Sequence, residues 1–471
     1  MSSNNVLLIY PIAPVMNRED RCQQPTNDLI VIPPLPPSDL LYIAAIARNA
    51  GKIPVVRDYS LIDDAQNQFI KDLNELKPEY VVINITSTNY YHDMLALKTI
   101  NDISPESRVI IKGAKFLGEY DDITALEKYK SLDIVIRGEV EETIKDIFEN
   151  KPLSEILGIT YRNGAKIIKN PQRPFIENLD SIPYPARDLI DNSKYIRPDT
   201  GEMQAVIKVS RGCPYHCFFC LATPVSGVKV RTRSPENILG EIKECYEKFG
   251  IKNFIFWSDI FNQDNEWVKA LCKAIIDSGL KITFSTNTRA DTADIETVKL
   301  MKQAGCSLVS IGIESGSNEI LQKIGKRITT EHVKNTVKMF KRLGIKIYAY
   351  YVIGLPWETK KTYRETMDFA KYLNTEFASF YTATPLSGTK FREYAEKNHL
   401  LVEDFDEGKS YYEASANTHE LNTQQVFDLV KNAYREYYIR PSYVLMMLFK
   451  IKSLNEFKNY FKAGLRVLFK R

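Results

Sequence analysis

The sequence predicts an α/β protein with an N-terminal doubly wound parallel sheet, a partial (β/α)6 barrel and a helical C-terminal region. Three observations predict this fold. Short apolar runs alternate with amphipathic segments over residues 1–150, and the alternation resumes with a longer period over residues 201–392. A proline-rich linker, residues 151–200, separates the two stretches, and residues 393–471 follow a helical, more basic pattern. A chain of 471 residues is long enough for several such units.

The bulk composition excludes several classes of protein. With 44% hydrophobic and 26% charged residues, the chain reads as a globular protein. Its 63 basic and 59 acidic residues nearly balance, which gives no reason to expect a nucleic-acid partner. We find no signal peptide at the start and no apolar run of membrane-spanning length. Seven cysteines, an odd number, do not suggest a disulfide framework, so we expect a cytoplasmic protein.

The N-terminal unit is predicted from strands and helices in strict alternation. "NVLLIYP" reads as a buried strand, and "PSDLLYIAAIARNAGK" reads as a helix that stops at Gly51. Further strands are expected in "PVVRDY", "YVVINITST", "RVIIKGAKF" and "DIVIRG", with helices between them. Such sheets bind ligands beyond the carboxyl ends of their strands, here near Pro11, Thr86, Gly113 and Gly138. Turn formation alone would equally explain these residues.

The linker and the central unit follow in the same manner. A hairpin is expected at Asn163-Gly164, after which four prolines keep the chain extended. Six strands of the barrel are predicted in "AVIKVS", "NFIFWS", "ITFSTN", "LVSIGI", "IYAYYVIG" and "FASFYTA", with amphipathic helices between them. Chemistry in such barrels takes place at the carboxyl ends of the strands.

The loop after the first barrel strand, "SRGCPYHCFFC", contains the candidate metal ligands. Cys213, Cys217 and Cys220 lie within eight residues, and three thiolates in one loop suit a soft metal or an iron–sulfur cluster. A closed zinc site or an electron-transfer cluster normally uses four protein ligands. Three ligands on a four-iron cluster leave one iron open. The alternatives are a Cys₃His zinc site completed by His216, and three cysteines without a metal.

This loop resembles the C-x3-C-x2-C loop of the radical S-adenosylmethionine (SAM) enzymes, including an aromatic Phe219 before the third cysteine. The resemblance implies that the cysteines hold a [4Fe–4S] cluster whose fourth iron is chelated by SAM. The reduced cluster would cleave SAM to methionine and a 5′-deoxyadenosyl radical. An external one-electron reductant of the flavodoxin or ferredoxin type is implied as a partner.

Further segments resemble the SAM-binding motifs of this family, in the expected order. "FWSDIF" is similar to the second-strand motif, with Asp259 as its polar residue, and "STNTRAD" to the third-strand motif. "SIGIESGS" is similar to the fourth-strand motif, and "VIGLPWET" and "TPLSGTKF" complete the series. The implied SAM-binding residues are Phe219, Asp259, Ser285, Asn287, Arg289 and Glu314. Arg289 and Glu314 could instead be structural ion-pair partners.

The N-terminal unit resembles the cobalamin-binding domain of one large radical SAM branch. The similarity lies in "PPLPPSDLLYIAAIARNAG", "DIVIRGEVEETIKDI" and "LDSIPYPARDLI". It implies cobalamin bound near Thr86, Ser87, Gly113, Gly138 and Glu139. Two departures stand out: the D-x-H-x-x-G element is absent from residues 1–150, and "IIKGAKF" places Lys112 and Lys115 where a corrin should approach. The only histidine there, His92, is expected at the surface or packed.

The branch contains methyltransferases that act on unactivated carbon or phosphorus, and anaerobic magnesium-protoporphyrin ester cyclases. The leading hypothesis is a cobalamin-dependent methyltransferase acting on a small-molecule or lipid-like substrate, and the alternative is a radical oxidative cyclase or other oxidoreductase. A third hypothesis is a non-catalytic sensor that binds a cluster or cobalamin, and it predicts no SAM cleavage. The complete series of SAM-site motifs argues against this hypothesis. Methylthiotransferases and auxiliary-cluster enzymes need further cysteines, whereas residues 1–150 contain only Cys22 and none follows Cys306.

The basic tail, "VLMMLFKIKSLNEFKNYFKAGLRVLFKR", leaves two hypotheses open. One is a helical cap packed over the open barrel, with its charges in water. The other is a basic amphipathic surface in peripheral contact with the inner face of the membrane, which would suit a lipid-like substrate.

Overall fold

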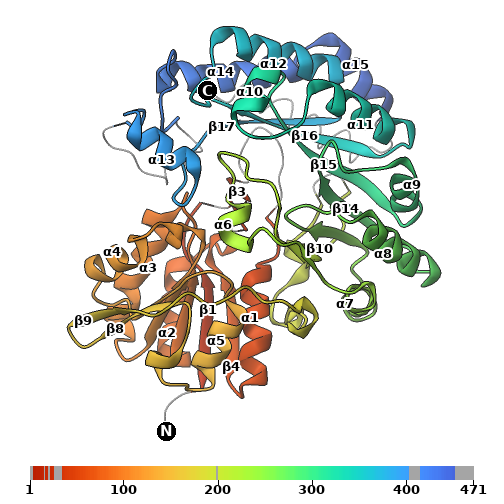
Figure 1. The fold of residues 1–471 in the computed structure, drawn as a ribbon. Coiled ribbons are helices and arrows are strands. Elements are labelled where there is room, and N and C mark those ends of the chain that lie inside the picture. Colours follow the sequence, from red (N-terminus) through yellow and green to blue (C-terminus); the bar gives the residue numbers. More distant parts are fainter. Residues whose placement is uncertain are drawn as a thin grey trace.

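The computed structural model describes residues 4–14, 16–19, 22–25, 34–197, 200–402 and 414–450. The described chain forms an α/β fold built on two sheets that are largely or wholly parallel (Figure 1). The first sheet has seven strands and the second has six. The predicted α/β class with parallel sheets is therefore confirmed.

The first sheet has the strand order β4-β1-β5-β6-β7-β8-β9. Its first five strands are parallel, and β8 and β9 join antiparallel. The turn between β8 and β9 confirms the hairpin predicted at Asn163-Gly164, and the hairpin extends this sheet rather than standing apart from it. The strands are β1 (Asn5–Tyr10), β4 (Ile53–Asp58), β5 (Tyr80–Asn84), β6 (Arg108–Lys112), β7 (Ile134–Ile136), β8 (Ile159–Asn163) and β9 (Lys166–Lys169).

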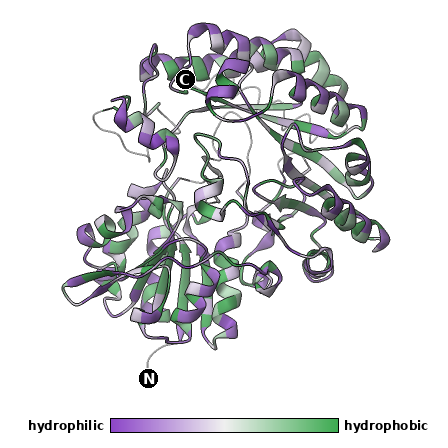
Figure 2. Ribbon diagram, viewed as in Figure 1, coloured by the Kyte–Doolittle hydropathy of each residue, from purple (hydrophilic) through white to green (hydrophobic). Residues whose placement is uncertain are grey.

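Helices cover both faces of this sheet. Alternate residues of β1 enter different cores: Val6 and Leu8 pack with α1 and α5, whereas Leu7 and Ile9 pack with α2, α3 and α4. Both faces of the strands are apolar because both are covered, as in other buried parallel sheets. Figure 2 shows this concentration of hydrophobic residues in the strands. The helices are α1 (Ser38–Asn49), α2 (Ala65–Leu76), α3 (Tyr90–Ile103), α4 (Asp121–Lys128) and α5 (Glu141–Phe148).

The second sheet is entirely parallel, with its strands in sequential order. The strands are β10 (Gln204–Lys208), β13 (Asn253–Trp257), β14 (Thr283–Thr288), β15 (Cys306–Glu314), β16 (Lys346–Ile353) and β17 (Phe377–Thr382). The connecting helices lie along the outer side in Figure 1. They are α7 (Pro235–Phe249), α8 (Asn265–Asp277), α9 (Ile295–Gln303), α10 (Asn318–Lys323), α11 (Thr330–Arg342) and α12 (Lys360–Leu373).

The C-terminal helices close the last edge of this sheet. These are α14 (Thr423–Tyr438) and α15 (Pro441–Lys450), whereas α13 (Lys390–Lys397) packs its Phe391 ring against that of Phe218. Tyrosine hydroxyls of α14 and α15 bind the edge backbone of β17 and the residues before it: Tyr438 accepts from the Ala378 N–H at 2.8 Å, Tyr434 accepts from the Phe380 N–H at 3.2 Å, and Tyr443 donates to the Glu376 carbonyl at 2.8 Å. An edge strand left open would present unpaired backbone groups.

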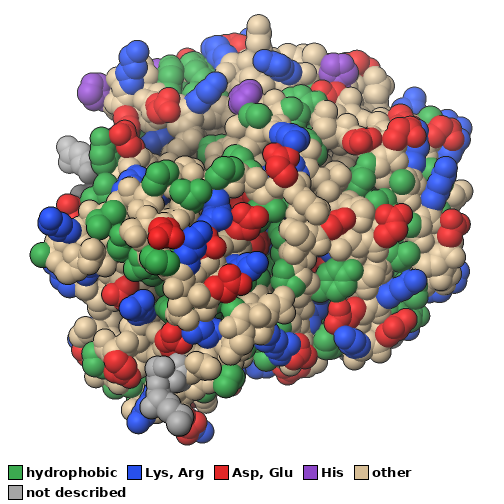
Figure 3. All heavy atoms as spheres, turned by 60° about the horizontal axis from the view of Figure 1, so that its bottom comes forward, with side chains coloured by type: hydrophobic (Ala, Val, Ile, Leu, Met, Phe, Trp, Pro, Cys, Tyr) green, Lys and Arg blue, Asp and Glu red, His purple; other side chains and the backbone are tan. Residues whose placement is uncertain are grey.

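The surface agrees with the balanced charge of the sequence. Basic and acidic side chains are interspersed over the face shown in Figure 3. Within the described ranges, no helix combines the length and apolar character needed to cross a bilayer. The part of the predicted basic tail beyond residue 450 lies outside the described residues.

Candidate active site

The three-cysteine loop follows the first strand of the second sheet and is held at its base by two short paired strands. β11 (Ser210–Arg211) pairs antiparallel with β12 (Arg231–Thr232), and the loop and the short helix α6 (Ala222–Ser226) lie between them. Gly212 has φ +97°, and a Cβ there would lie 2.0 Å from the Lys229 carbonyl oxygen. Only glycine fits this position, which aims the chain into the loop.

The loop cysteines differ from the other cysteines that the structure describes. Cys213, Cys217 and Cys220 are half-buried, whereas Cys245, Cys272 and Cys306 are buried. Burial raises the pKa of the thiols of Cys245 and Cys272 to about 12. Because the reactive and metal-binding form is the thiolate, the loop cysteines are the suitable ligands.

The position of His216 bears on the zinc alternative. Among the described residues, no group of three His, Cys, Asp or Glu side chains lies close enough together to hold a single metal ion, and His216 is exposed. A zinc ion needs its sulfur ligands about 2.3 Å from one centre. A four-iron cluster binds each thiolate through a different iron, so its ligands stand farther apart. The loop thus offers three half-buried thiols as candidate ligands, while His216 lies exposed.

Phe218 anchors the cysteine loop to segments that lie later in the chain. The Phe218 N–H donates to the Ile324 carbonyl at 2.9 Å, and the Phe218 carbonyl accepts from the Phe391 N–H at 3.0 Å. The Phe218 ring lies 5.0 Å from the Trp357 ring, between centroids. Phe219, predicted to contact SAM, is half-buried and packs against the core of this unit.

Asp259 and Asn287, both predicted from the SAM motifs, lie directly behind the loop. The Asp259 carboxylate accepts from the Gly212 N–H at 2.7 Å, and its carbonyl accepts from Asn287 Nδ2 at 3.2 Å. Asn287 Oδ1 in turn accepts from the Ser258 hydroxyl at 2.6 Å. This network fixes the start of the cysteine loop against the ends of β13 and β14.

Glu314 ends β15 in a strained, buried position. Its φ is +68°, unusual for a residue other than glycine, and its carboxylate pairs with Lys326 Nζ at 2.7 Å. A Cβ on Gly312 would lie 2.4 Å from the Glu314 carboxylate, so glycine makes room for the pair. Burial lowers the pKa of Lys326, but the charges of Glu314 and Cys217 outweigh burial and raise it. The pair therefore lies beside the cysteine loop.

Arg289, also predicted from the SAM motifs, is held by the loop and its neighbours. Its guanidinium lies 3.7 Å above the Tyr215 ring and pairs with Asp291 at 2.6 Å. It also donates to the Lys326 carbonyl. Arg289 and Glu314 thus both form ion pairs, which is the alternative that the sequence left open. Both residues lie beside the cysteine loop.

The face of the second sheet that points away from helices α7–α12 carries partly buried side chains, and we call it the inner face. Along β14, Thr283, Ser285 and Asn287 are half-exposed, whereas the alternate residues are buried. The middle parts of β13, β15 and β16 show the same alternation. An ordinary closed barrel fills its interior with side chains. Ser285 therefore lies on the same inner face as Asn287, two residues closer to the amino end of the strand.

The carboxyl edge of the first sheet contains the residues predicted to contact cobalamin. Thr86 and Ser87 are buried, and the Thr86 N–H donates to Asp93 at 3.0 Å. Gly113 has φ +150°, and a Cβ there would lie 2.0 Å from the Ile85 carbonyl oxygen. His92 is exposed on α3, at the surface.

Polar atoms without partners lie at this edge. Arg18, on β2 (Met16–Glu19), is 2% exposed and pairs with Asp93 at 2.9 Å, yet its Nε and Nη2 have no hydrogen-bond partner among the described residues. The Oδ1 of Asn84 also lacks one there. Buried groups of this kind favour a polar ligand, because leaving them unpaired is costly. The amide-rich rim of a corrin fits such donors and acceptors.

Both lysines of "IIKGAKF" have partners in the first unit. Lys112 is buried and pairs with Asp39 at 2.7 Å. The Lys115 ammonium lies 5.6 Å from the Tyr90 ring centroid. Both charges are thus directed to partners in the first unit.

Ion pairs bring the edge of the first sheet to the cysteine loop. Glu139 pairs with Arg231 at 2.9 Å and with Arg211 at 3.2 Å, and Arg211 also pairs with Glu141. Burial raises the pKa of Glu141, but Arg211 outweighs burial and lowers it. Gly138, the neighbour of Glu139, has φ +76°. Arg211 and Arg231 lie on the two short strands that flank the cysteine loop, so this loop lies beside the carboxyl edge of the first sheet.

The sequence reasoning missed three contributors to this site. The first two are Lys326 and Gly212, to which the sequence motifs gave no role. The third is the Asp39–Lys208 ion pair, which joins α1 to the end of β10. A glycine directly before the first cysteine was the one available signal. The others join residues that are far apart in the sequence.

Comparison with known proteins gives a consistent result. The family model described as the radical SAM superfamily matches residues 207–370. An uncharacterized methyltransferase of Pyrococcus horikoshii is 30% identical over 419 residues, which are 88% of this chain and 90% of the relative. The anaerobic magnesium-protoporphyrin IX monomethyl ester cyclase of Cereibacter sphaeroides is 25% identical, over 86% of this chain and 68% of that protein.

A solved structure has the same fold. The radical SAM methyltransferase TsrM from Kitasatospora setae, with cobalamin and a [4Fe–4S] cluster bound, matches with a TM-score of 0.67. The match covers 84% of this chain and 78% of that chain, at 18% identity.

Proposed function

Because this chain belongs to the radical SAM superfamily, we propose that it is a cobalamin-dependent radical SAM methyltransferase acting on an unactivated carbon of a small-molecule or lipid-like substrate. The observation that carries the proposal is the position of the three accessible thiols. They lie at the carboxyl ends of the second sheet, and ion pairs of Arg211 and Arg231 join their loop to the carboxyl edge of the first sheet. The named methyltransferase relative and the TsrM fold support the same function.

The second sheet supplies the support for a partial (β/α)6 barrel. Six parallel strands stand in sequential order, and the inner face remains half-exposed. We place SAM at the carboxyl ends of β13–β15, against Phe219, Asp259, Ser285, Asn287, Arg289 and Glu314.

The cysteines Cys213, Cys217 and Cys220 would hold the [4Fe–4S] cluster. When bound, the cluster supplies the electron, taken from an external one-electron reductant, that cleaves SAM, and cobalamin supplies the methyl group. The side chains of this chain position these groups. Asp259 fixes the start of the cysteine loop through Gly212, and the Glu314–Lys326 pair offers a carboxylate and an ammonium beside Cys217.

Cobalamin would lie between the two sheets, near Thr86, Ser87, Gly113, Gly138 and Glu139. Arg18 and Asn84 offer unpaired polar atoms at that edge. Glu139 is already engaged by two arginines, so its role is to join the units. The D-x-H-x-x-G element, which supplies a histidine to cobalt in other cobalamin proteins, is absent from residues 1–150.

The experiment is anaerobic reconstitution with iron, sulfide and hydroxocobalamin, followed by iron and cobalt analysis. Incubation with SAM, reductant and candidate small molecules or lipids would then be assayed for methylated product and S-adenosylhomocysteine. Both products are expected. The second candidate is the oxidative cyclase reaction, because a cyclase is among the relatives. It would be favoured if the protein binds a cluster and cleaves SAM but contains no cobalt and forms no S-adenosylhomocysteine.

We also propose that α15 contacts the membrane surface. Val444, Leu445, Leu448 and Phe449 are 46%, 56%, 52% and 88% exposed. Residues 450–471 add seven Lys and Arg against one Glu. Exposed apolar side chains beside basic residues are typical of binding to anionic lipid surfaces. Co-sedimentation with anionic vesicles, lost on Leu448→Ser and Phe449→Ser substitution and at high salt, is expected; equal sedimentation of the variant would refute it.

A further inference from the structure

A cavity lies at the amino edge of the first sheet, where β6 and β7 begin and where β8, antiparallel to β7, ends. We call it the amino-edge cavity. Its volume is about 450 Å³, which is within the range of small-molecule binding sites. The residues that line it are Arg108, Asp133, Ile134, Leu153, Ser154, Tyr161, Arg162 and Asn163.

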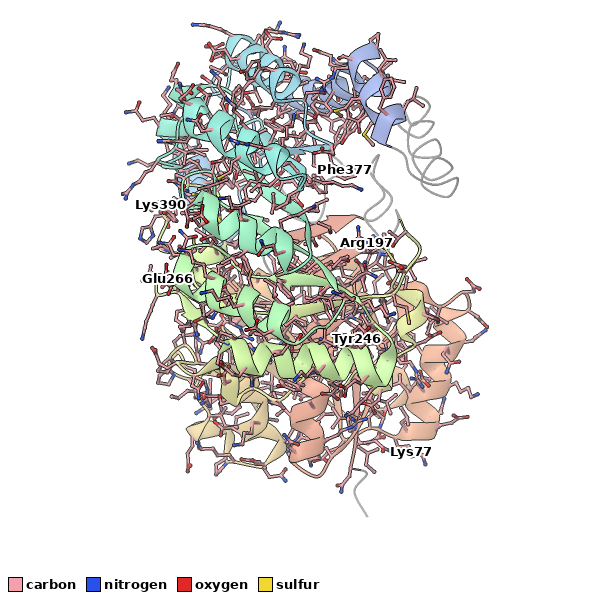
Figure 4. The ribbon with its side chains drawn as sticks, turned by 90° about the vertical axis from the view of Figure 1, so that its right-hand side faces the viewer. Lys77, Arg197, Tyr246, Glu266, Phe377 and Lys390 are labelled. Carbon is pink, nitrogen blue, oxygen red and sulfur yellow. The ribbon has the colours of Figure 1, made fainter. Side chains whose placement is uncertain are left out.

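The direction of the strands separates this cavity from the proposed cofactor sites. Cobalamin is proposed at the carboxyl ends of the same parallel strands, where Gly113 and Gly138 follow β6 and β7. Lys77, which precedes β5 at the amino edge, lies at the bottom of Figure 4. Lys390 lies higher in the same view, and its neighbour Phe391 bonds the cysteine loop. The cavity is therefore separate from the site already described.

Two guanidinium groups line the amino-edge cavity. Arg108 is exposed and has no ion pair among the residues that the structure describes. Arg162 is half-buried, and its Nε and Nη2 donate to the backbone carbonyls of Leu126, Tyr129 and Leu132. Its Nη1 has no hydrogen-bond partner in the described part of the chain. The three carbonyls thus fix the Arg162 guanidinium and leave one of its amino groups for a ligand.

Asp133 adds a negative charge to the same lining. Its Oδ2 accepts from the Val109 N–H at 2.7 Å, and within the described ranges its Oδ1 accepts no hydrogen bond. Burial raises the pKa of the Asp133 carboxyl, and the charges of Arg108 and Arg162 oppose this effect. The two cations and the carboxylate therefore act on one another around one space.

Apolar side chains form another part of the lining. Ile134 and Tyr161 are register partners on β7 and β8, and both are buried in the core under α1 and α5. Leu153 is half-buried and packs against the same core. The Ser154 and Asn163 side chains are exposed. The cavity thus combines two cations, one carboxylate and an apolar surface.

A free amino acid matches this combination. Guanidinium groups bind carboxylates through charge-assisted hydrogen bonds, and a carboxylate binds an ammonium group in the same way. We propose that the amino-edge cavity binds a free amino acid with an apolar side chain. Arg108 and Arg162 bind its carboxylate, and Asp133 binds its ammonium group. Its side chain lies against Leu153 and Tyr161. This site does not depend on the proposed function, because neither cofactor takes part in it.

The test compares three forms of one amino acid. Reconstituted full-length protein, without SAM, is titrated calorimetrically with L-leucine, L-leucine methyl ester and N-acetyl-L-leucine. The ester lacks the carboxylate charge, and the acetyl compound lacks the ammonium charge. We expect both to bind at least about tenfold more weakly than L-leucine, because a hydrogen bond to a charged group contributes at least about that factor. No saturable binding of L-leucine, or equal affinities of the three compounds, would overturn the proposal.

Variants then locate the binding. Arg108→Met and Asp133→Asn should each weaken L-leucine at least about tenfold, and Asp133→Asn keeps an oxygen for the Val109 N–H. Arg108→Met should also lose most of the discrimination against the ester, and Asp133→Asn most of that against N-acetyl-L-leucine. A purely structural role would not produce this selectivity. Lys98→Met, which removes an exposed cation from α3, is the matched control and should bind as wild type.

Wild-type affinity for L-leucine in Arg108→Met, or an equal loss in Lys98→Met, would refute the assignment. Formation of 5′-deoxyadenosine by the same preparations, after SAM and reductant are added, is measured separately. Failure of the amino-edge cavity and failure of the radical SAM proposal therefore remain distinct.

Discussion

Removing the positive partner of Glu314 should destabilise the second unit in a pH-dependent way. The Glu314 and Lys326 side chains are 9% and 11% exposed and meet at 2.7 Å. Breaking a buried ion pair on one side leaves an uncompensated charge and costs about 3–5 kcal/mol. We expect Lys326→Met to lower the free energy of unfolding by about that amount at pH 7.

The pH dependence follows from the charge that remains. In the variant the buried Glu314 carboxylate has lost its cation, so its unpaired negative charge is what destabilises the folded state. Stability of the variant relative to wild type should then fall as pH rises above about 4.3, and the deficit should shrink at low pH. A Glu314→Gln/Lys326→Met double variant should recover most of the loss, because no buried charge remains.

The assay is urea unfolding followed by tryptophan fluorescence. Trp257, Trp267 and Trp357 all lie in residues 201–392, so the signal reports on this unit. Lys323→Met is the matched control, because its pair with Glu319 is exposed on both sides and should contribute less than about 1 kcal/mol. A Lys326→Met loss no larger than that of the control, or one independent of pH, would refute the reasoning.

Three further predictions concern other residues. Burial raises the pKa of Glu358 to about 8, although the Gly354 N–H donates a hydrogen bond that lowers it. The free energy of unfolding of the wild type should therefore fall by up to about 5 kcal/mol as pH rises from 4 to 8. Glu358→Gln should flatten this pH dependence in urea titrations, and an unchanged slope would contradict the prediction. Gly113→Ala should abolish cobalt binding but keep the iron content, because the added Cβ would clash with the Ile85 backbone. Full cobalt occupancy of this variant in metal analysis would contradict the proposed cobalamin site. Arg211→Met should cost about 3–5 kcal/mol at pH 7 and less near pH 4, because without Arg211 burial raises the pKa of Glu141 and the unpaired carboxylate takes up a proton; an equal loss at both pH values would exclude the ion-pair explanation.

Much of the fold could be predicted because local patterns determined it. The alternation of strands and helices and the hairpin at Asn163-Gly164 are encoded in neighbouring residues, and so is the cysteine loop. Lys112 shows where such reasoning ends. The sequence suggested that it would obstruct a corrin, but Asp39, 73 residues earlier, takes its charge. Long-range pairs of this kind leave no local signal.

The candidate site divides in the same way. Asp259 and Asn287 were found through motifs at strand ends, where parallel strands bring side chains together. Lys326 was not, because its role depends on the left-handed turn at Glu314 and on space left by Gly312. The tyrosines that seal β17 come from a helix more than 50 residues farther along the chain. Only the folded chain reveals these contacts.

The central claim is that Cys213, Cys217 and Cys220 hold a cluster that cleaves SAM. The most direct measurement is 5′-deoxyadenosine formation by anaerobically reconstituted protein with SAM and dithionite, beside iron analysis. Wild type and Cys306→Ser, which alters a buried cysteine, should bind about four irons and form the product, whereas Cys217→Ser should lose both. Product formation by Cys217→Ser at the wild-type level, or none by wild type with a full cluster, would contradict the account.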